Sequence, residues 1–246
     1  MEKVIHYFWF GRKEKPEIVK KCMSSWQDKM PGWKMIEWNE DNFDVNSIPY
    51  TAEAYEAGKY AFVSDYARCK VLYEQGGVYL DTDVEVLKPL DELVENHKGF
   101  MGFELDETVA PGLITGTEKG NVIMRDMCRI YESIHYKLEN GKYNNTTVVE
   151  YATRVLVQHG LQLNGQKQIV EDITIFPREY FAPYNIYTER MEITDHTYSI
   201  HHYTATWQGG WLKLRFRIKK QCKMIVGPQL TKKIISLKRK IKGVKG

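Results

Sequence analysis

The sequence is poor in cysteine and has no long apolar segment. Its four cysteines lie far apart and include no CxxC pair, which argues against a zinc site or a redox dithiol (Cys22, Cys69, Cys128, Cys222). No apolar run approaches the ~20 residues that cross a bilayer. The opening residues 1–5 lack the basic start and small-residue cleavage site of a secretory signal. We therefore expect a cytoplasmic protein whose cysteines remain thiols.

Acidic residues are missing from the end of the chain. Residues 211–246 contain 13 basic and no acidic residues, whereas residues 1–210 contain 22 basic and 32 acidic residues. The overall net charge of +3 therefore combines an acidic body with a basic tail. The acidic body argues against general nucleic-acid binding.

The tail also has a helical pattern. After Pro228 its apolar residues fall on one helical face, with lysines around them (Leu230, Ile234, Leu237, Ile241, Val244). A basic amphipathic helix suits an anionic membrane surface, so we expect the protein to lie peripherally on the inner face of the cell membrane. A solvated, frayed C-terminus explains the same run of charge.

The body shows the alternation of strands and helices that is typical of an α/β fold. A buried strand at 4–10, an amphipathic helix after Pro16 and a strand at 33–38 predict parallel pairing. Further helices are predicted at 50–58, 61–75, 122–138 and 146–160, and further strands at 78–80, 100–103 and 198–203. We predict one catalytic domain over residues 1–210, followed by the tail at 211–246.

Two carboxylates follow the strand that begins after Gly76 and Gly77. Asp81 and Asp83 are one residue apart at its carboxyl end, where open α/β sheets bind their ligands. Such a pair costs electrostatic energy unless a cation offsets it, and Mg²⁺ or Mn²⁺ with oxygen ligands is the usual choice. An Asp-x-Asp triplet alone is weak evidence, and its position after a buried strand strengthens it.

Asp65 and Arg68 lie on the helix that leads to this strand. They are three residues apart and share a helical face. They could form an ordinary intrahelical ion pair, which contributes little to stability. They could instead hold sugar hydroxyls and phosphate oxygens through a carboxylate and a guanidinium.

Three segments together resemble the DXD-containing sugar-transfer family, glycosyltransferase family 32. The first two are Ile5-His6-Tyr7-Phe8-Trp9-Phe10-Gly11 and the block from Ala61 to Asp83. The third is Ile200-His201-His202-Tyr203-Thr204-Ala205-Thr206-Trp207. The family includes capsular polysaccharide glycosyltransferases and α-1,6-mannosyltransferases, and the glucosyltransferase domains of large clostridial toxins are more distantly similar.

The resemblance implies a GT-A fold, Rossmann-like with a mixed central sheet, that transfers a hexose with retention of configuration. Asp65, Arg68, Asp81 and Asp83 are the implied catalytic residues. The donor would contact these and further residues of the three segments (Phe8, Trp9, Ser64, Tyr79, Thr82, Thr206, Trp207). Trp9 would stack on the base; without the resemblance it would be assigned to the core.

The resemblance also implies Mn²⁺ or Mg²⁺ held by Asp83, Asp81 and His202. Neutral imidazole is a reasonable metal ligand. His201 and His202 would point to opposite faces of a strand, so one of them is expected to be structural. Relatives carry an asparagine near the segment 109–116 that this sequence lacks, and we assign no catalytic base.

The leading hypothesis is a hexosyltransferase of surface or capsular polysaccharide synthesis (EC 2.4.1.-). Its expected donor is UDP-galactose or UDP-glucose, and its expected acceptor is a lipid-linked saccharide. One alternative is a haloacid-dehalogenase-type phosphatase that uses Asp81 as nucleophile, but its motif is expected nearer the N-terminus. The other is a non-catalytic adaptor that binds membrane or nucleic acid through the basic tail.

Overall fold

The computed structural model describes residues 1–185 and 190–204. The chain divides into two compact units, Met1–Pro183 with Ile193–Tyr203, and Tyr184–Glu192 with Thr204–Gly246. The described part of the second unit contains a short antiparallel pair, β10 (Tyr184–Asn185) and β11 (Arg190–Met191). The predicted tail at 211–246, its boundary at residue 210, and the candidate residues Thr206 and Trp207 lie outside the described residues.

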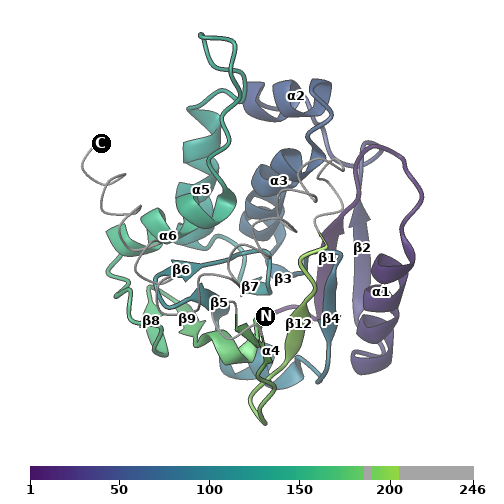
Figure 1. Cartoon of the computed structure of the whole chain (residues 1–246), viewed down its shortest axis with the longest axis vertical. Helices are drawn as coiled ribbons and strands as arrows, with labels where there is room; N and C mark the ends of the chain where they lie inside the picture. Colours follow the sequence, from purple (N-terminus) through teal and green to yellow (C-terminus); the bar gives the residue numbers. More distant parts are fainter. Residues whose placement is uncertain (186–189, 205–246) are drawn as a thin grey trace, which may run out of the picture. The chain divides into compact units, whose positions relative to one another are not determined.

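The first unit is built on a mixed eight-stranded sheet (Figure 1). Seven of its strands follow the order β2-β1-β3-β7-β5-β9-β8, and β6 pairs with β5. The strands are β1 (Val4–Phe8), β2 (Lys34–Trp38), β3 (Gly77–Tyr79), β5 (Gly99–Leu105), β6 (Thr108–Val109), β7 (Thr115–Thr117), β8 (Gln168–Val170) and β9 (Ile173–Phe176). The predicted α/β fold with a mixed central sheet is confirmed.

One end of the sheet is parallel, as the alternating sequence pattern predicts. Strand β1 pairs in parallel with both β2 and β3. Helix α1 (Glu17–Lys29) connects β1 to β2 and begins directly after Pro16. A proline suits this position because it has no N–H to leave unsatisfied in the first turn. The carboxyl ends of β1, β2 and β3 therefore meet at one edge of the sheet.

The other end of the sheet contains antiparallel pairs that the sequence pattern did not reveal. Strand β7 runs antiparallel to both β3 and β5, whereas β9 runs parallel to β5 and antiparallel to β8. Strand β7 has only three residues, Thr-Gly-Thr, too few to show a hydrophobic period. It lies between β3 and β5, and it makes the sheet mixed.

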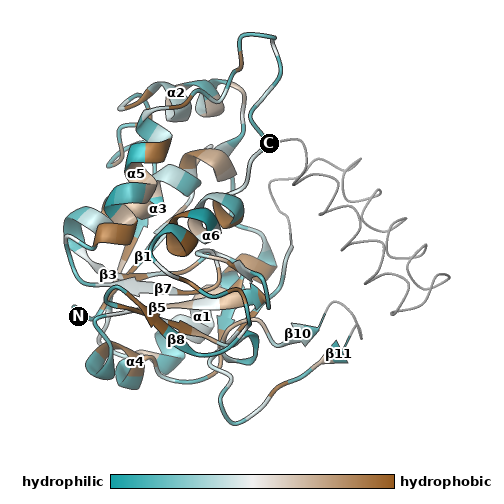
Figure 2. Ribbon diagram, turned by 90° about the vertical axis from the view of Figure 1, so that its left-hand side faces the viewer, coloured by the Kyte–Doolittle hydropathy of each residue, from teal (hydrophilic) through white to brown (hydrophobic). Residues whose placement is uncertain are grey.

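Helices cover both faces of the sheet, and each face has its own apolar core (Figure 2). Helices α2 (Pro49–Glu56), α3 (Tyr60–Gln75), α5 (Val122–Glu132) and α6 (Val148–Gln158) lie on one face. Helix α1 and helix α4 (Asp91–Asn96) contribute to the core of the other face. Within the described residues no helix combines the length and apolarity needed to cross a bilayer.

The helix predicted at 122–138 ends earlier than expected. Helix α5 stops at Glu132, and Ser133 is its C-cap. Glu53 of α2 accepts hydrogen bonds from the Lys137 N–H and His135 Nδ1, which draws the following segment away from the helix axis. Tyr136 is fully buried against Tyr50 and Phe62. Tertiary packing therefore overrides the apolar pattern that favoured a longer helix.

A second, two-stranded sheet pairs β4 (Val84–Val86) with β12 (Ser199–His201) in antiparallel register. Trp26 of α1 donates its indole N–H to the Val84 carbonyl over 2.7 Å, and the Val86 N–H donates to Ser25 Oγ. A short 3-10 helix, η1 (Arg178–Tyr180), follows β9. The contacts of Trp26 and Ser25 hold β4 in place directly after Asp81 and Asp83.

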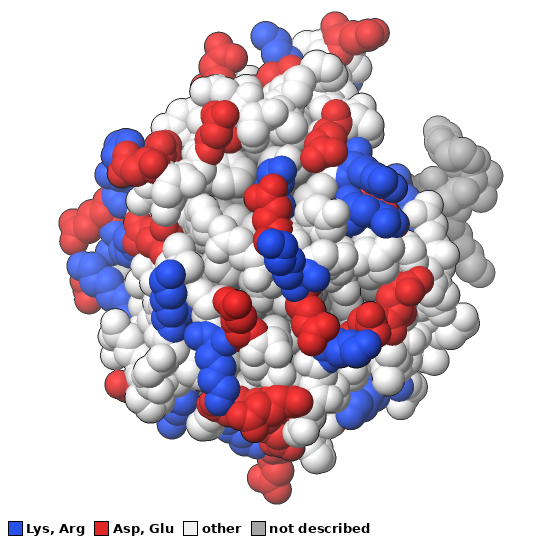
Figure 3. All heavy atoms as spheres, turned by 180° about the vertical axis from the view of Figure 1, so that it is seen from behind, with Lys and Arg blue, Asp and Glu red and all other residues white. Residues whose placement is uncertain are grey.

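The described part of the chain has a surface of mixed charge and buried thiols. Acidic and basic side chains are interspersed on the face shown in Figure 3. Cys22, Cys69 and Cys128 are free and buried, and Cys222 lies outside the described residues. Burial raises the pKa of the Cys22 thiol to about 12, so this cysteine is not a ready nucleophile.

Candidate functional site

Asp81 and Asp83 lie in the turn that joins β3 to β4. The Val84 N–H donates to the Asp81 carbonyl over 3.0 Å, which closes the turn. Side-chain exposure is 28% for Asp81 and 15% for Asp83, so both carboxylates are largely withdrawn from water. Thr82 is half-buried between them. The turn sits at the edge of the sheet where β1 also ends, and Trp9 follows β1 there.

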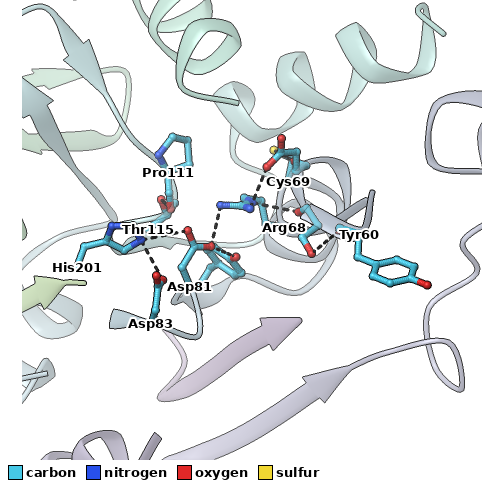
Figure 4. A network of polar contacts seen from close by, with 11 residues as sticks. Tyr60, Arg68, Cys69, Asp81, Asp83, Pro111, Thr115 and His201 are labelled. Atoms are coloured by element: carbon cyan, nitrogen blue, oxygen red, sulfur yellow. Dashed lines mark hydrogen bonds and ion pairs between the residues drawn. The ribbon is translucent and has the colours of Figure 1, made fainter. Parts of the chain in front are cut away.

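His201 lies between the two carboxylates (Figure 4). Its Nε2 is 3.1 Å from Asp83 Oδ1 and 3.7 Å from Asp81 Oδ2. Ligand atoms of the three residues all lie within 4.8 Å of one another, close enough to share one metal ion. Burial alone would lower the pKa of His201, but its contacts with the two carboxylates outweigh this and raise it to about 10.

The structure gives His201, not His202, the position facing the carboxylates. His201 pairs with Val84 across the β4–β12 ladder, and adjacent residues of a strand point to opposite faces. His202 points away and contacts Glu85 Oε2 at 2.7 Å, and Lys21 contacts the same carboxylate at 3.2 Å. The candidate metal-binding histidine is therefore His201 and not the predicted His202.

Arg68 connects helix α3 to Asp81 (Figure 4). It donates from Nη1 to Asp81 Oδ1 over 3.1 Å and from Nη2 to Asp65 Oδ1 over 3.0 Å. Its guanidinium lies over the ring of Tyr79, 4.6 Å from the centroid, and Tyr79 donates its hydroxyl to Asp81. Burial raises the pKa of Asp81, but Arg68 and His201 bring it below its usual value. Asp81 is therefore held as a carboxylate.

Asp65 is the most deeply placed carboxylate of the site. Its side chain is 11% exposed, and it accepts hydrogen bonds from Arg68 and from the Val148 N–H at the start of α6. Burial raises the pKa of Asp65 to about 7, although Arg68 opposes the shift. The pair with Arg68 is not the exposed intrahelical ion pair that the sequence allowed, because Arg68 is only 6% exposed.

The remaining candidate residues differ in how far their side chains are buried. Trp9 is half-buried, its indole N–H donates to the Lys13 carbonyl over 2.6 Å, and the Lys15 ammonium is 5.7 Å from its ring centroid. Phe8, an expected donor contact, is a buried core residue that packs against Trp38 and Tyr79. Ser64 donates to the Tyr60 carbonyl over 3.1 Å.

The backbone at Gly112 approaches the Asp81 carboxylate closely. A Cβ atom at this position would lie 2.2 Å from Asp81 Oδ2 and 3.2 Å from Arg68 Nη1. The Asp81 N–H also donates to the Gly112 carbonyl over 3.3 Å. The segment from Pro111 to Thr115 is fixed by a 2.9 Å bond from Thr115 Oγ1 to the Pro111 carbonyl. Gly112 therefore forms a wall of the site that only glycine can form.

Glu104 and Tyr203 form a further polar pair beside the site. Glu104 is at the end of β5 and accepts a hydrogen bond from the Tyr203 hydroxyl. The Tyr203 ring stands edge-on to the His201 imidazole, with centroids 4.1 Å apart. Their association was not predictable from the sequence, because they are about a hundred positions apart.

Part of the chain is similar to known glycosyltransferases. Residues 16–100 match the family described as "Glycosyltransferase sugar-binding region containing DXD motif", a range that includes Asp65, Arg68, Asp81 and Asp83. The resemblance predicted from the sequence is confirmed by this match.

Two relatives illustrate how much of the chain is shared. An initiation-specific alpha-1,6-mannosyltransferase of Candida albicans is 30% identical over 113 residues, which cover 43% of this chain and 28% of that protein. An uncharacterized glycosyltransferase of Acanthamoeba polyphaga mimivirus is 23% identical over 193 residues, which cover 76% of this chain and 75% of that protein. The chain spans 28% of the length of each of the first two curated relatives that it matches.

Among solved structures, the PaToxG glycosyltransferase is similar with a TM-score of 0.48 and 19% identity. The match covers 64% of this chain and 69% of that structure.

Proposed function

We propose that this chain is a metal-dependent glycosyltransferase that moves a hexose from a nucleoside diphosphate sugar to a saccharide acceptor, with retention of configuration. One observation carries the proposal: Asp81, Asp83 and His201 converge at the edge of the sheet, beside the Arg68–Asp65 pair. Four of these five residues lie inside the matched sugar-binding region. Retention is inferred from the family resemblance.

The residues present fit a divalent cation. Two carboxylates and one imidazole offer ligand atoms within 4.8 Å of one another. Carboxylates suit Mn²⁺ and Mg²⁺, and an imidazole favours Mn²⁺ of the two. A bound cation would supply charge stabilisation for the departing diphosphate. Since Arg68 pairs with Asp81, part of the negative charge of the site is already offset.

The proposed reaction exchanges one C–O bond for another. The bond between the anomeric carbon and the diphosphate breaks, and its electron pair leaves with the diphosphate. An acceptor hydroxyl forms the new bond on the same face of the sugar, and its proton passes to the leaving phosphate. Asp65 and Arg68 would orient the sugar hydroxyls, and Trp9 at the end of β1 would stack on the base.

UDP-galactose or UDP-glucose remains the donor that we propose from the resemblance. The name of the Candida albicans relative adds mannose as an alternative sugar. Both are hexoses, so the proposed reaction class is the same, and a donor panel decides between them.

The test is donor turnover by the purified full chain with MnCl₂. We would incubate it with UDP-galactose, UDP-glucose, UDP-N-acetylglucosamine and GDP-mannose and measure released nucleotide and free sugar. Turnover of one donor that Asp83→Asn abolishes and Asp172→Asn preserves supports the proposal; Asp172 is an exposed surface carboxylate. Release of phosphate from p-nitrophenyl phosphate, without donor turnover, would instead support the phosphatase.

For the tail we propose a role in membrane attachment, with a lipid-linked saccharide as acceptor in surface polysaccharide synthesis. Each basic residue near an anionic lipid surface contributes ~1 kcal/mol of attraction. The measurement is binding of the full chain to liposomes containing phosphatidylglycerol at low salt. A variant with Lys232, Lys233, Lys238, Arg239 and Lys240 changed to glutamine should lose this binding. Equal binding by both proteins would refute the role.

A further inference from the structure

One nitrogen of the proposed metal-binding histidine has no hydrogen-bond partner in the described part of the chain. His201 directs Nε2 towards Asp83 and Asp81, while its Nδ1 is buried and unpartnered. A histidine that binds metal through one ring nitrogen almost always donates its other N–H to a carboxylate, a carbonyl or a water. A buried N–H without an acceptor is unfavourable. The Nδ1 atom therefore requires an acceptor when Nε2 binds metal.

The carboxylates around His201 are not equally available for this role. Asp81 and Asp83 face Nε2. Glu85 is bound by His202 and Lys21. Glu104 has a hydrogen bond from Tyr203, and it lies close enough to His201 and Asp81 to interact with both electrostatically.

Tyr203 links Glu104 to His201 in space. Its ring packs edge-on against the imidazole, with centroids 4.1 Å apart, and its hydroxyl donates to Glu104. Tyr203 has a φ of 50°, in the left-handed region that side chains other than glycine rarely adopt. Such backbone strain persists only where the surroundings enforce it. This conformation lets the Tyr203 ring contact His201 while the Tyr203 hydroxyl binds Glu104.

We propose that Glu104 is a positioning residue for His201, accepting the Nδ1–H when Nε2 binds a divalent cation. Tyr203 holds the Glu104 carboxylate in place. The arrangement would be a carboxylate–histidine–metal relay formed by residues from β5 and β12. This inference rests on the proposed function, because it assumes that Asp81, Asp83 and His201 bind the cation.

The test measures Mn²⁺ affinity without any donor. We would titrate the full chain with MnCl₂, follow free Mn²⁺ by electron paramagnetic resonance, and record the ¹⁴N imidazole coupling of bound Mn²⁺ by electron spin echo envelope modulation. Glu104→Leu should weaken Mn²⁺ binding by about 10- to 100-fold and reduce the coupling. Glu104→Gln should bind more tightly than Glu104→Leu, because its amide oxygen still accepts a hydrogen bond.

Two further variants separate positioning from folding. Tyr203→Phe keeps Glu104 and should cause a smaller loss of affinity than Glu104→Leu. Glu107→Gln, an exposed position in the turn after β5, should bind Mn²⁺ as the unaltered chain does. Unchanged Kd and imidazole coupling in Glu104→Leu would overturn the inference.

The outcomes also separate this inference from the proposed function. If the unaltered chain binds Mn²⁺ with imidazole coupling, and Asp83→Asn abolishes binding, the metal site is supported whatever Glu104 does. If the unaltered chain binds no Mn²⁺, or binds it without imidazole coupling, the relay is refuted together with the proposed ligand set.

Discussion

Arg68 and Asp81 form a 3.1 Å ion pair that joins the middle of helix α3 to the turn after β3. The same guanidinium also binds Asp65, so the positive charge of Arg68 lies between two carboxylates. Arg68 is 6% exposed, and both partners are largely withdrawn from water. The planar fork of arginine suits this double role, which the single ammonium of lysine cannot reproduce.

We predict that Arg68→Met destabilises the chain strongly. Removing one member of a buried ion pair leaves an uncompensated charge, which typically costs about 3–5 kcal/mol of unfolding free energy. Urea denaturation at pH 7 measures the loss. Arg68→Met combined with Asp81→Asn should lose less than Arg68→Met alone, because the negative charge of Asp81 is also removed. An Arg68→Met chain as stable as the unaltered one would contradict this account.

A second prediction concerns Gly112. In Gly112→Ala the new Cβ would lie 2.2 Å from Asp81 Oδ2, so the carboxylate or the loop must move. A displacement of about 1 Å in a catalytic site can reduce turnover by about 100-fold, and we expect that scale of loss in donor turnover. Gln158→Ala is the control, because it introduces alanine at an exposed helical position. Equal turnover by Gly112→Ala and the unaltered chain would show that the close approach is unimportant.

The parallel half of the fold was predictable because its elements have clear periods and boundaries. The strand at β1, the proline before α1 and the double glycine after α3 all appear in the sequence as they act in the structure. The antiparallel strand β7 was not predictable. Its three residues have no distinctive pattern, and its place depends on pairing with β3 and β5, which are distant in the sequence.

Part of the candidate site was also predictable from the sequence, and part was not. Asp65, Arg68, Asp81 and Asp83 lie in one continuous block, so their association could be predicted from local structure. The choice between His201 and His202 depends on how β12 pairs with β4, a contact between segments more than a hundred residues apart. Alternation along a strand predicts that one histidine faces the carboxylates, but only the register identifies which.

A third prediction concerns His159, which lies at the end of α6 and bridges the carboxylates of Asp126 and Glu171. Its Nδ1 is 2.8 Å from Glu171 Oε1 and its Nε2 is 3.0 Å from Asp126 Oδ2. These contacts, with Glu171 first, raise the pKa of His159. Its contribution to stability is therefore complete below its unfolded pKa of about 6.5 and is lost as pH rises through the folded value.

The comparison of His159→Gln with the unaltered chain tests this. The unaltered chain should be more stable at pH 6 by no more than about 1 kcal/mol, because the cluster is partly exposed, and the difference should shrink by pH 9. Urea denaturation at both values provides the measurement. A difference that grows with pH would show that the assigned direction is wrong.

The pKa of His6 shifts in the opposite direction to that of His159, because His6 is buried as a neutral ring. Its Nε2–H donates to the Gly76 carbonyl over 3.0 Å, and its Nδ1 accepts from the Trp38 indole N–H over 3.1 Å. A second proton would have to sit on Nδ1, facing the Trp38 donor. Burial lowers the pKa of His6 to about 4, although the Gly76 carbonyl opposes the shift.

The fourth prediction is a loss of stability in acid that depends on His6. The unfolded chain gains a proton on this histidine near pH 6.5, whereas the folded chain gains it only near pH 4, so stability falls as pH drops through this window. The full effect is about 3 kcal/mol. His6→Gln should reduce the fall in unfolding free energy between pH 7 and pH 4.5, measured by urea denaturation. An equally steep fall in both proteins would show that groups other than His6 cause the loss of stability in acid.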